Sequence, residues 1–144
     1  MKLSVQREKE QHLRYISNMN KKSRICIVDD DPICVFTTKI ILEASKRFDE
    51  IQVFNSGKEA FETLSLKADE ELPSIIILDI NMPIWDGWDF LDEIVKKPLA
   101  GETKIYVVSS SNDPEDILKA KSYPMVLDFV LKPIDIQKII ASHQ

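Results

Sequence analysis

The sequence predicts an α/β fold in which five parallel strands form one doubly wound sheet. Short apolar segments, typical of strands buried on both faces, alternate five times with longer segments of helical periodicity. Turn residues such as Gly and Pro separate many of these segments. Regular alternation favours right-handed crossovers that place helices on both faces of the sheet. The expected strand order is 2-1-3-4-5, which puts the first and third strands side by side.

The predicted strands cover residues 25–28, 51–54, 75–79, 105–108 and 127–131. The second is more polar than the others, so we expect it near an edge of the sheet. Each intervening segment should turn one apolar face inward. The faces expected are Ile33, Thr37, Ile40, Ile41 and Ala44 in the first helix, Ala60, Phe61 and Leu64 in the second, Leu91, Ile94 and Val95 in the third, and Ile136, Ile139 and Ile140 in the last.

Residues 1–22 differ in charge from the rest of the chain. They carry six Lys and Arg against two Glu, while the net charge of the chain is −5, so the remainder carries −9. Because the apolar stripe of residues 1–23 is thin, we expect a basic extension, helical or mobile, outside a domain of residues 24–144. The acidic body argues against nucleic acid as a partner, since phosphate contacts need a basic face.

The composition also bears on compartment and chemistry. No apolar run approaches the roughly 20 residues of a membrane helix, and the N-terminus lacks a signal-peptide pattern. Cys26 and Cys34 are typical of packing in a reducing compartment. His12 and His143 lie near the chain ends, so no catalytic histidine is expected inside the fold. We therefore expect a cytoplasmic protein without a membrane partner.

Acidic side chains follow two strands that the predicted order makes neighbours. Asp29 and Asp30 follow the first strand, and Asp79 ends the third. Ligands of doubly wound sheets bind beyond the carboxyl ends of the strands, so these carboxylates should share one crevice. They repel one another, and a divalent cation resolves the repulsion. With no Cys or His at the site, oxygen ligands favour Mg²⁺. We expect Asp30 and Asp79 to bind it directly, Asp29 through water and Asn81 through its backbone carbonyl.

A hydroxyl and an ammonium group reach the same edge of the sheet. Ser109 ends the fourth strand, and Lys132 follows the fifth. A phosphoryl group needs hydrogen-bond donors and positive charge around its oxygens, so this pair facing a metal-bound carboxylate is typical of a site that receives one. Asp31 before Pro32 has a different role, because it looks like a helix N-cap with proline at the first helical position.

As an ordered set, these motifs resemble the receiver domain of two-component response regulators, of the flavodoxin-like and CheY-like fold. The resemblance covers about residues 24–142, and its spacings fit: 49 residues from Asp30 to Asp79, 30 on to Ser109 and 23 on to Lys132. The matching segments are Val28-Asp29-Asp30-Asp31, Leu78-Asp79-Ile80-Asn81-Met82-Pro83, Val108-Ser109-Ser110 and Phe129-Val130-Leu131-Lys132-Pro133.

The resemblance implies that Asp79 accepts a phosphoryl group from a sensor histidine kinase or a histidine phosphotransfer protein. Asp29 and Asp30 would be the acidic pair that holds Mg²⁺. Ser109 matches the switch hydroxyl of the family and Lys132 its phosphate-facing lysine. Phe129 matches the switch aromatic, and it departs from the Tyr of the family pattern because it has no hydroxyl to bond.

No output domain is apparent after the last predicted helix, so we expect a stand-alone receiver that is a signalling phospho-acceptor and not an enzyme. Its output would be contact with an unknown downstream protein or phosphoryl relay. Phosphorylation should draw Ser109 inward, let Phe129 rotate into the vacated space, and so change the helix near residues 113–121 together with the fifth strand.

Two other functions fit parts of the pattern. A haloacid-dehalogenase-type phosphatase uses two Asp residues spaced like Asp29 and Asp31, but Asp31 looks like a helix cap and no acidic pair follows Lys132. The second alternative is a receiver-shaped scaffold that never carries phosphate. A small-molecule phosphodonor separates the three: labelling at Asp79 favours the receiver, labelling at Asp29 the phosphatase, and no labelling the scaffold.

Overall fold

The sheet has the predicted topology. A computed structural model describes residues 2–20, 22–99 and 102–142, without the side chains of residues 2 and 14–20. All five strands are parallel, in the order β2-β1-β3-β4-β5, so β1 and β3 are neighbours and β2 lies at an edge. The strands are β1 (Arg24–Val28), β2 (Glu50–Phe54), β3 (Ile75–Asp79), β4 (Lys104–Ser109) and β5 (Val126–Leu131).

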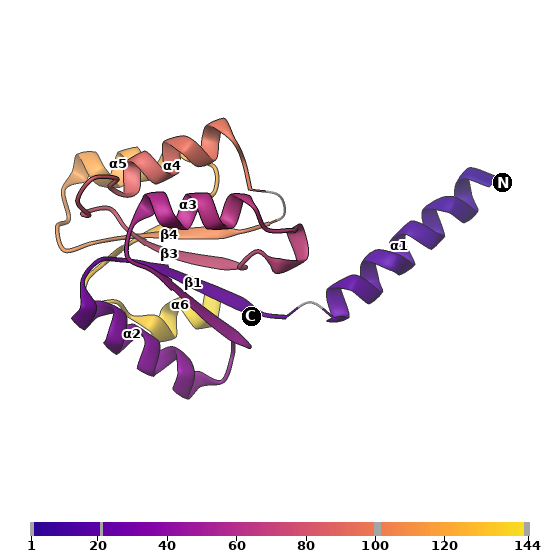
Figure 1. Cartoon of the computed structure of the whole chain (residues 1–144), viewed down its shortest axis with the longest axis horizontal. Coiled ribbons are helices and arrows are strands. Elements are labelled where there is room, and N and C mark those ends of the chain that lie inside the picture. The colour runs from indigo at the N-terminus through magenta and orange to yellow at the C-terminus, as the bar shows by residue number, and fades with distance from the viewer. Residues whose placement is uncertain (1, 21, 100–101, 143–144) are drawn as a thin grey trace.

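Helices cover both faces of the sheet (Figure 1). One layer contains α3, α4 and α5, and the opposite layer contains α2 and α6. The helices are α1 (Lys2–Asn20), α2 (Pro32–Ser45), α3 (Gly57–Ser65), α4 (Gly87–Lys96), α5 (Pro114–Lys121) and α6 (Ile136–Ser142), with a 3₁₀ turn η1 (Asp69–Glu71) before β3.

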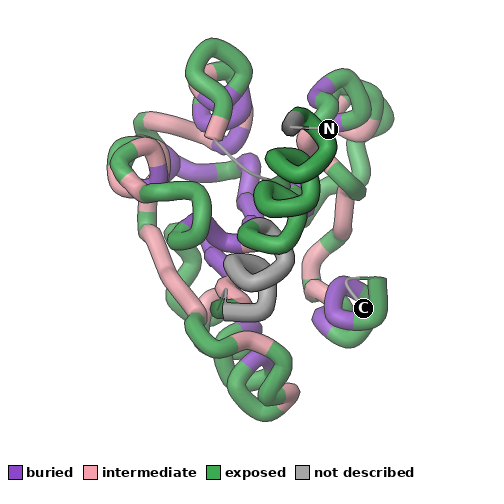
Figure 2. The backbone as a smooth tube through the Cα atoms, turned by 90° about the vertical axis from the view of Figure 1, so that its right-hand side faces the viewer, coloured by how far each residue is buried: buried purple, intermediate pink, exposed green. Residues whose placement is uncertain are grey.

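The central strand β3 is buried along its whole length. Alternate side chains on a strand point to opposite faces, so Ile76 and Leu78 enter the core under α3, α4 and α5. Ile75 and Ile77 enter the core under α2 and α6. Figure 2 shows this buried centre beneath exposed outer helix faces. A strand buried on both faces explains the continuous apolar run seen in the sequence.

Aspartates fix the start of the helices that follow the sheet edge. As predicted, Asp31 caps α2, where its Oδ1 accepts hydrogen bonds from the N–H groups of Ile33 (3.0 Å) and Cys34 (3.4 Å). Asp86 and Asp89 form a reciprocal capping box at α4. These caps satisfy N–H groups that the first helical turn leaves unpaired, and they set where each loop of the edge ends.

The inward face predicted for α2 is wrong. Thr38 and Leu42 are buried, whereas Ile33 is 74% exposed and Ile40 49% exposed; Thr37, Ile41 and Ala44 are exposed as well. The helix carries apolar residues on most of its circumference, so periodicity alone did not distinguish the buried stripe from the one beside it. Packing against the sheet selects the stripe rotated by one residue.

The faces of the other helices agree with the sequence apart from one residue. Ala60, Leu64, Leu91 and Ile94 are buried, Phe61 is half-buried, and α6 buries Ile136, Ile139 and Ile140. Val95 is 51% exposed. It follows Ile94 by about 100° around the helix axis, which turns it away from the core.

Helix α1 projects away from the body (Figure 1). Residues 3–13 are exposed throughout, including the large apolar side chains Leu3 and Leu13. Residues 2–20 of the expected extension form this helix. Among the described residues, no helix combines the length and apolar character that crossing a membrane requires. The domain boundary after residue 23 stays a prediction.

A chain that starts at Met19 tests this boundary. Because residues 3–13 bury no side chain against the body, the shortened chain should unfold at nearly the same temperature as the whole chain. Thermal unfolding followed by circular dichroism measures this. A loss of stability above about 3 kcal/mol, comparable to truncating a buried leucine, would show that the extension belongs to the folded core.

Candidate functional site

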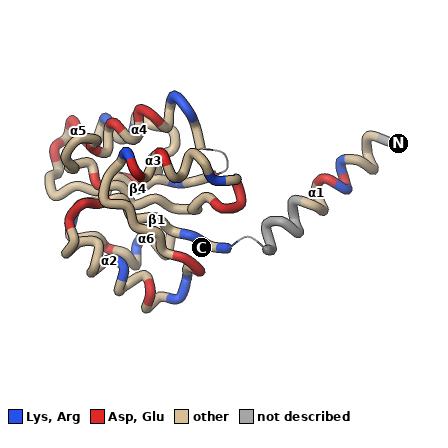
Figure 3. Tube along the Cα trace, in the orientation of Figure 1, with Lys and Arg blue, Asp and Glu red and all other residues tan. Residues whose placement is uncertain are grey.

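Three carboxylates meet where β1 and β3 end. Each of Asp29, Asp30 and Asp79 offers one oxygen, and these oxygens lie within 4.8 Å of one another. Asp29 and Asp79 are buried, whereas Asp30 is exposed. Figure 3 shows the acidic segment that follows β1 at this end of the sheet. The pairing of β1 with β3 brings together residues that are 50 positions apart in sequence.

Lys132 joins the two buried carboxylates. Its Nζ lies 3.0 Å from Oδ2 of Asp29 and 3.3 Å from Oδ2 of Asp79. Burial by itself lowers the pKa of Lys132, but the hydrogen bond and charge of Asp29 and the charge of Asp79 outweigh it and raise the pKa above its usual value. The ammonium group therefore stays charged, and it partly offsets the repulsion between the carboxylates.

Asp29 and Asp79 each accept the same kind of hydrogen bond from the backbone of their own loop. Oδ1 of Asp29 accepts from the N–H of Asp31 at 2.9 Å, and Oδ1 of Asp79 accepts from the N–H of Asn81 at 3.0 Å. An Asx side chain bonded to the backbone two residues on fixes a turn. Each carboxylate thus has one oxygen on its own loop and the other on Lys132.

The carboxyl group of Asp79 has the perturbed acidity of a functional site. Burial raises its pKa, the backbone N–H of Asn81 lowers it, the charge of Asp29 raises it and Lys132 lowers it, and together these effects place it at about 6. Burial prevails because the single ammonium group is shared between two carboxylates. The ionised form of Asp79 is therefore electrostatically destabilised in the folded protein, and added positive charge nearby would stabilise it.

Ser109 is fully buried at the end of β4. Its Oγ accepts hydrogen bonds from the N–H of Ser111 (3.0 Å) and from Nδ2 of Asn81 (3.2 Å), and its carbonyl accepts from the N–H of Lys132 (2.8 Å). Ser109 is thereby tied to the loop after β3 and to the loop after β5. The sequence predicted its place at this edge but not its bond to the Asn81 side chain.

Phe129 occupies the middle of β5, two residues along the strand from the level of Ser109. It pairs with Val107, while Ser109 pairs with Leu131. Its ring is half-buried against the apolar core under α3, α4 and α5. Phe129 is therefore neither fully buried nor free in solvent, and its role as the switch aromatic stays a prediction.

Gly87 contacts the backbone beneath Asp79. A Cβ at this position would lie 2.7 Å from Cα of Ile80 and 2.8 Å from the carbonyl oxygen of Asp79. Real Cβ atoms essentially never approach backbone atoms this closely, so only glycine lets α4 start here against the end of β3. The sequence showed a glycine before a helix but gave no sign of this contact.

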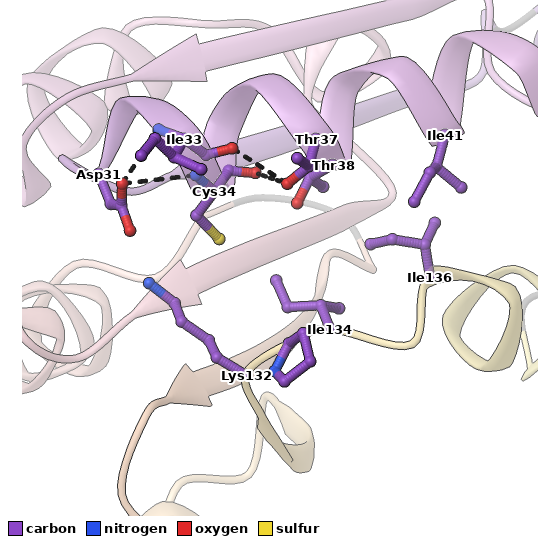
Figure 4. A pocket seen from close by; sticks show the side chains of 10 residues that line it. Asp31, Ile33, Cys34, Thr37, Thr38, Ile41, Lys132, Ile134 and Ile136 are labelled. Atoms are coloured by element: carbon purple, nitrogen blue, oxygen red, sulfur yellow. Dashed lines mark hydrogen bonds between the residues drawn. The ribbon is translucent and has the colours of Figure 1, made fainter.

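A cavity of about 570 Å³, lined in part by Lys132, opens between α2 and the segment after β5 (Figure 4). Lys132 and Cys34 face each other across it. Burial and the nearby charge of Asp29 raise the pKa of the Cys34 thiol to about 11, so the thiol stays protonated and is a poor metal ligand. The packing role expected for Cys34 stays a prediction.

The donor atoms of the cluster fit Mg²⁺. All three side chains offer carboxylate oxygen, and none of the described Cys or His side chains joins the group. A hard divalent cation prefers such ligands, whereas a soft metal would need thiolate or imidazole. The exposed Asp30 leaves the cluster open on the solvent side, which suits an ion that keeps several of its waters.

Comparison with known protein families gives the affiliation of the chain. The model of the response regulator receiver domain matches residues 25–144. The chain belongs to this family. The resemblance seen in the sequence is thereby confirmed, and so is the predicted fold, which solved receiver domains share.

Two solved structures illustrate the likeness. A two-component response regulator from Cytophaga hutchinsonii is 33% identical, with a TM-score of 0.77 over 86% of this chain and 96% of that one. A response regulator receiver protein from Dyadobacter fermentans is 27% identical, with a TM-score of 0.72 over 81% of this chain and 91% of that one. Both align over nearly their whole length with the body of this chain.

The curated relatives are longer. The probable C4-dicarboxylate response regulator DctR of Bacillus subtilis is 29% identical over 119 residues, which are 83% of this chain and 50% of that protein. The chain thus spans about half the length of this relative and of the corresponding protein of Halalkalibacterium halodurans. What is shared is the receiver domain.

The two helix-starting glycines allow a matched test of the contact beneath Asp79. Gly87→Ala should destabilise the protein by about 1–3 kcal/mol, because the methyl group forces a backbone shift in a packed region. Gly57→Ala, whose Cβ would find its nearest atoms at 3.4 Å, should change stability by less than about 1 kcal/mol. Urea unfolding measures both. Equal losses in the two variants would contradict the role given to Gly87.

The acidity of Asp79 predicts a pH dependence of stability in the absence of divalent cations. The folded pKa of about 6 lies above the unfolded value near 3.9, so the folded state holds this proton more tightly. The resulting stability is present at pH 4 and is lost as the pH rises through 6. At pH 7, Asp79→Asn should therefore exceed the wild type by on the order of 1–2 kcal/mol.

Denaturant unfolding at pH 4 and pH 7, with a chelator present, measures this difference. Near pH 4 the two proteins should be about equally stable, because Asp79 is then protonated in the folded state. A wild type more stable than Asp79→Asn at pH 7 would contradict the electrostatic destabilisation assigned to this carboxylate.

Proposed function

We propose that this receiver domain accepts a phosphoryl group on Asp79 from a sensor histidine kinase or a histidine phosphotransfer protein. The observation that supports this most strongly is the convergence on Asp79 of one half-buried ammonium group and two further carboxylates. A carboxylate oxygen of Asp79 forms the new bond to phosphorus as the bond from phosphorus to the donor's histidine nitrogen breaks. Phosphoryl transfer depends mainly on positioning and charge, and both are arranged at this carboxylate.

Each neighbouring residue has a proposed role in that step. The backbone N–H of Asn81 holds one oxygen of Asp79 in place. Lys132, already 3.3 Å from Oδ2 of Asp79, is placed to pair with an oxygen of the incoming group. Ser109 supplies a hydroxyl at the same sheet edge. These are the donors and the positive charge that a phosphoryl group requires.

Asp30, Asp79 and the backbone carbonyl of Asn81 are proposed to hold Mg²⁺, with Asp29 acting through water. When bound, Mg²⁺ would supply positive charge that offsets the carboxylates and the oxygens of the transferring phosphoryl group. Asp29 keeps Lys132 in place through their 3.0 Å ion pair, which suits a residue one step removed from the ion.

The signal is proposed to pass from Ser109 to β5 and α5. A phosphoryl group adds close to two negative charges and three acceptor oxygens, and Ser109 can move toward them because it ends a strand. Phe129, half-buried on the neighbouring strand, can turn into the space that Ser109 leaves. Since Phe129 gains only burial, at most about 1–3 kcal/mol, the two states must lie close in energy for phosphate to tip the balance.

The phosphatase alternative is weakened by the local structure. It needs Asp31 as a second catalytic acid, but this carboxylate caps α2 with two hydrogen bonds. Only an experiment can distinguish a scaffold that never carries phosphate from a receiver that accepts it. Several expectations from the sequence stay predictions. They are the stand-alone organisation, the cytoplasmic compartment, the absence of nucleic acid as a partner and the existence of a downstream protein target. The absence of enzymatic activity beyond self-phosphorylation and self-dephosphorylation is also a prediction.

Labelling with a small-molecule phosphodonor tests the acceptor. The wild type should gain one acid-labile, Mg²⁺-dependent phosphoryl group at Asp79, located by mass spectrometry. Asp79→Asn should abolish it because the amide lacks the carboxylate oxygen that forms the bond to phosphorus. Asp69→Asn, an exposed carboxylate on η1, is the matched control and should label normally. Undiminished labelling of Asp79→Asn, or none in the wild type, would overturn the proposal.

Backbone amide NMR with and without beryllofluoride, which mimics phospho-aspartate, tests the signal path. Shifts should extend from Ser109 through α5 to Phe129 and Lys132, because those residues rearrange around the new anion. Residues 3–13, whose side chains are exposed, serve as the internal reference. Shifts confined to the loops after β1 and β3 would contradict the proposed coupling.

A further inference from the structure

The side-chain amide of Asn81 bridges the acceptor loop and the switch hydroxyl. Its backbone N–H binds Oδ1 of Asp79, while its Nδ2 donates to Oγ of Ser109 at 3.2 Å. We propose that this amide is a positioning group that leaves the hydrogen of the Ser109 hydroxyl free to bind an oxygen of the phosphoryl group. The inference rests on the proposed function of Asp79 and assigns a role to a side chain for which we expected only a backbone contribution.

The argument begins with the valence of a hydroxyl oxygen. A serine Oγ has two lone pairs and one hydrogen. Both lone pairs of Ser109 receive a donor, one from the N–H of Ser111 at 3.0 Å and one from Nδ2 of Asn81. The hydrogen must then occupy the one remaining direction around the oxygen. Within the described part of the chain, no acceptor for that hydrogen is recorded.

The burial of Ser109 increases the importance of the hydrogen bond that the Asn81 amide donates to it. Ser109 is 0% exposed when the amide is in place, so its oxygen depends on donors from the protein. A buried donor without an acceptor is unfavourable. A phosphoryl oxygen arriving on Asp79 would satisfy it. Without the amide, one lone pair is free and the hydrogen can turn into that direction, away from the phosphoryl group.

The amide is also placed to couple the two partners. Asn81 lies two residues after the acceptor, so its backbone and side chain together fix the loop that carries Asp79 relative to the end of β4. The side chain itself is exposed, and its removal should leave the core intact. Its effect should therefore appear in recognition of the phosphoryl group and not in folding.

A double-mutant cycle on beryllofluoride affinity tests this role. The four proteins are the wild type, Asn81→Ala, Ser109→Ala and the double variant, titrated by calorimetry at Mg²⁺ concentrations that saturate each of them. Asn81→Ala should weaken binding by about five- to tenfold, equivalent to one hydrogen bond, when Ser109 is present. In the Ser109→Ala background the same change should have less than about a twofold effect, since the two groups act as one unit.

Ser111→Ala is the matched control, because it removes a neighbouring hydroxyl and keeps the backbone N–H that binds Ser109. Its affinity should stay within about twofold of the wild type. Equal losses on Asn81→Ala in both backgrounds would overturn the inference. So would tighter binding, which would mean that the amide oxygen accepts the Ser109 hydrogen. A wild type that binds no beryllofluoride would overturn the proposed function as well.

A spectroscopic measurement tests the bond directly. The side-chain amide protons of Asn81 should shift in the ¹H–¹⁵N spectrum of Ser109→Ala, because Nδ2 loses its acceptor. They should stay unchanged in Ser111→Ala. An Asn81 side-chain signal that is the same in all three proteins would show that the bond does not form in solution, and it would overturn the inference even if the variants bind normally.

Discussion

The repulsion between carboxylates at one edge of the sheet is the constraint on which the site depends. Asp29 and Asp79 are buried next to each other, and Asp30 completes a group whose oxygens lie within 4.8 Å. One ammonium group, that of Lys132, is shared by the two buried members. The negative charge therefore exceeds the positive charge. The site is built to attract further cations, and its acceptor is held in a state that added positive charge stabilises.

The packing of the sheet keeps these mutually repelling carboxylates together. The strand order places β1 beside β3, so the apolar residues of both strands fix the carboxylates at their ends. Gly87 allows α4 to begin directly against the end of β3, and Lys132 enters from the end of β5. Apolar burial along the strands offsets the electrostatic cost at their ends, a division common at functional sites.

Much of this arrangement could be predicted because it follows from local sequence patterns. Buried parallel strands are continuous apolar runs, and residues at their carboxyl ends share one edge whatever their separation in sequence. The buried stripe of α2 was missed because that helix is apolar on most of its circumference. The Asn81–Ser109 bond depends on how loops after different strands meet, and the contact of Gly87 depends on how the loop after β3 folds back onto the end of that strand. No local sequence pattern predicts those contacts.

Calorimetric titration with Mg²⁺ alone tests the central claim most directly, because it probes the excess negative charge without any phosphodonor or partner. The account predicts one ion bound per chain, with weaker binding when Asp30→Asn or Asp79→Asn removes a carboxylate, and unchanged binding in Asp69→Asn. Absence of binding to the wild type, or equal affinity in all four proteins, would contradict it.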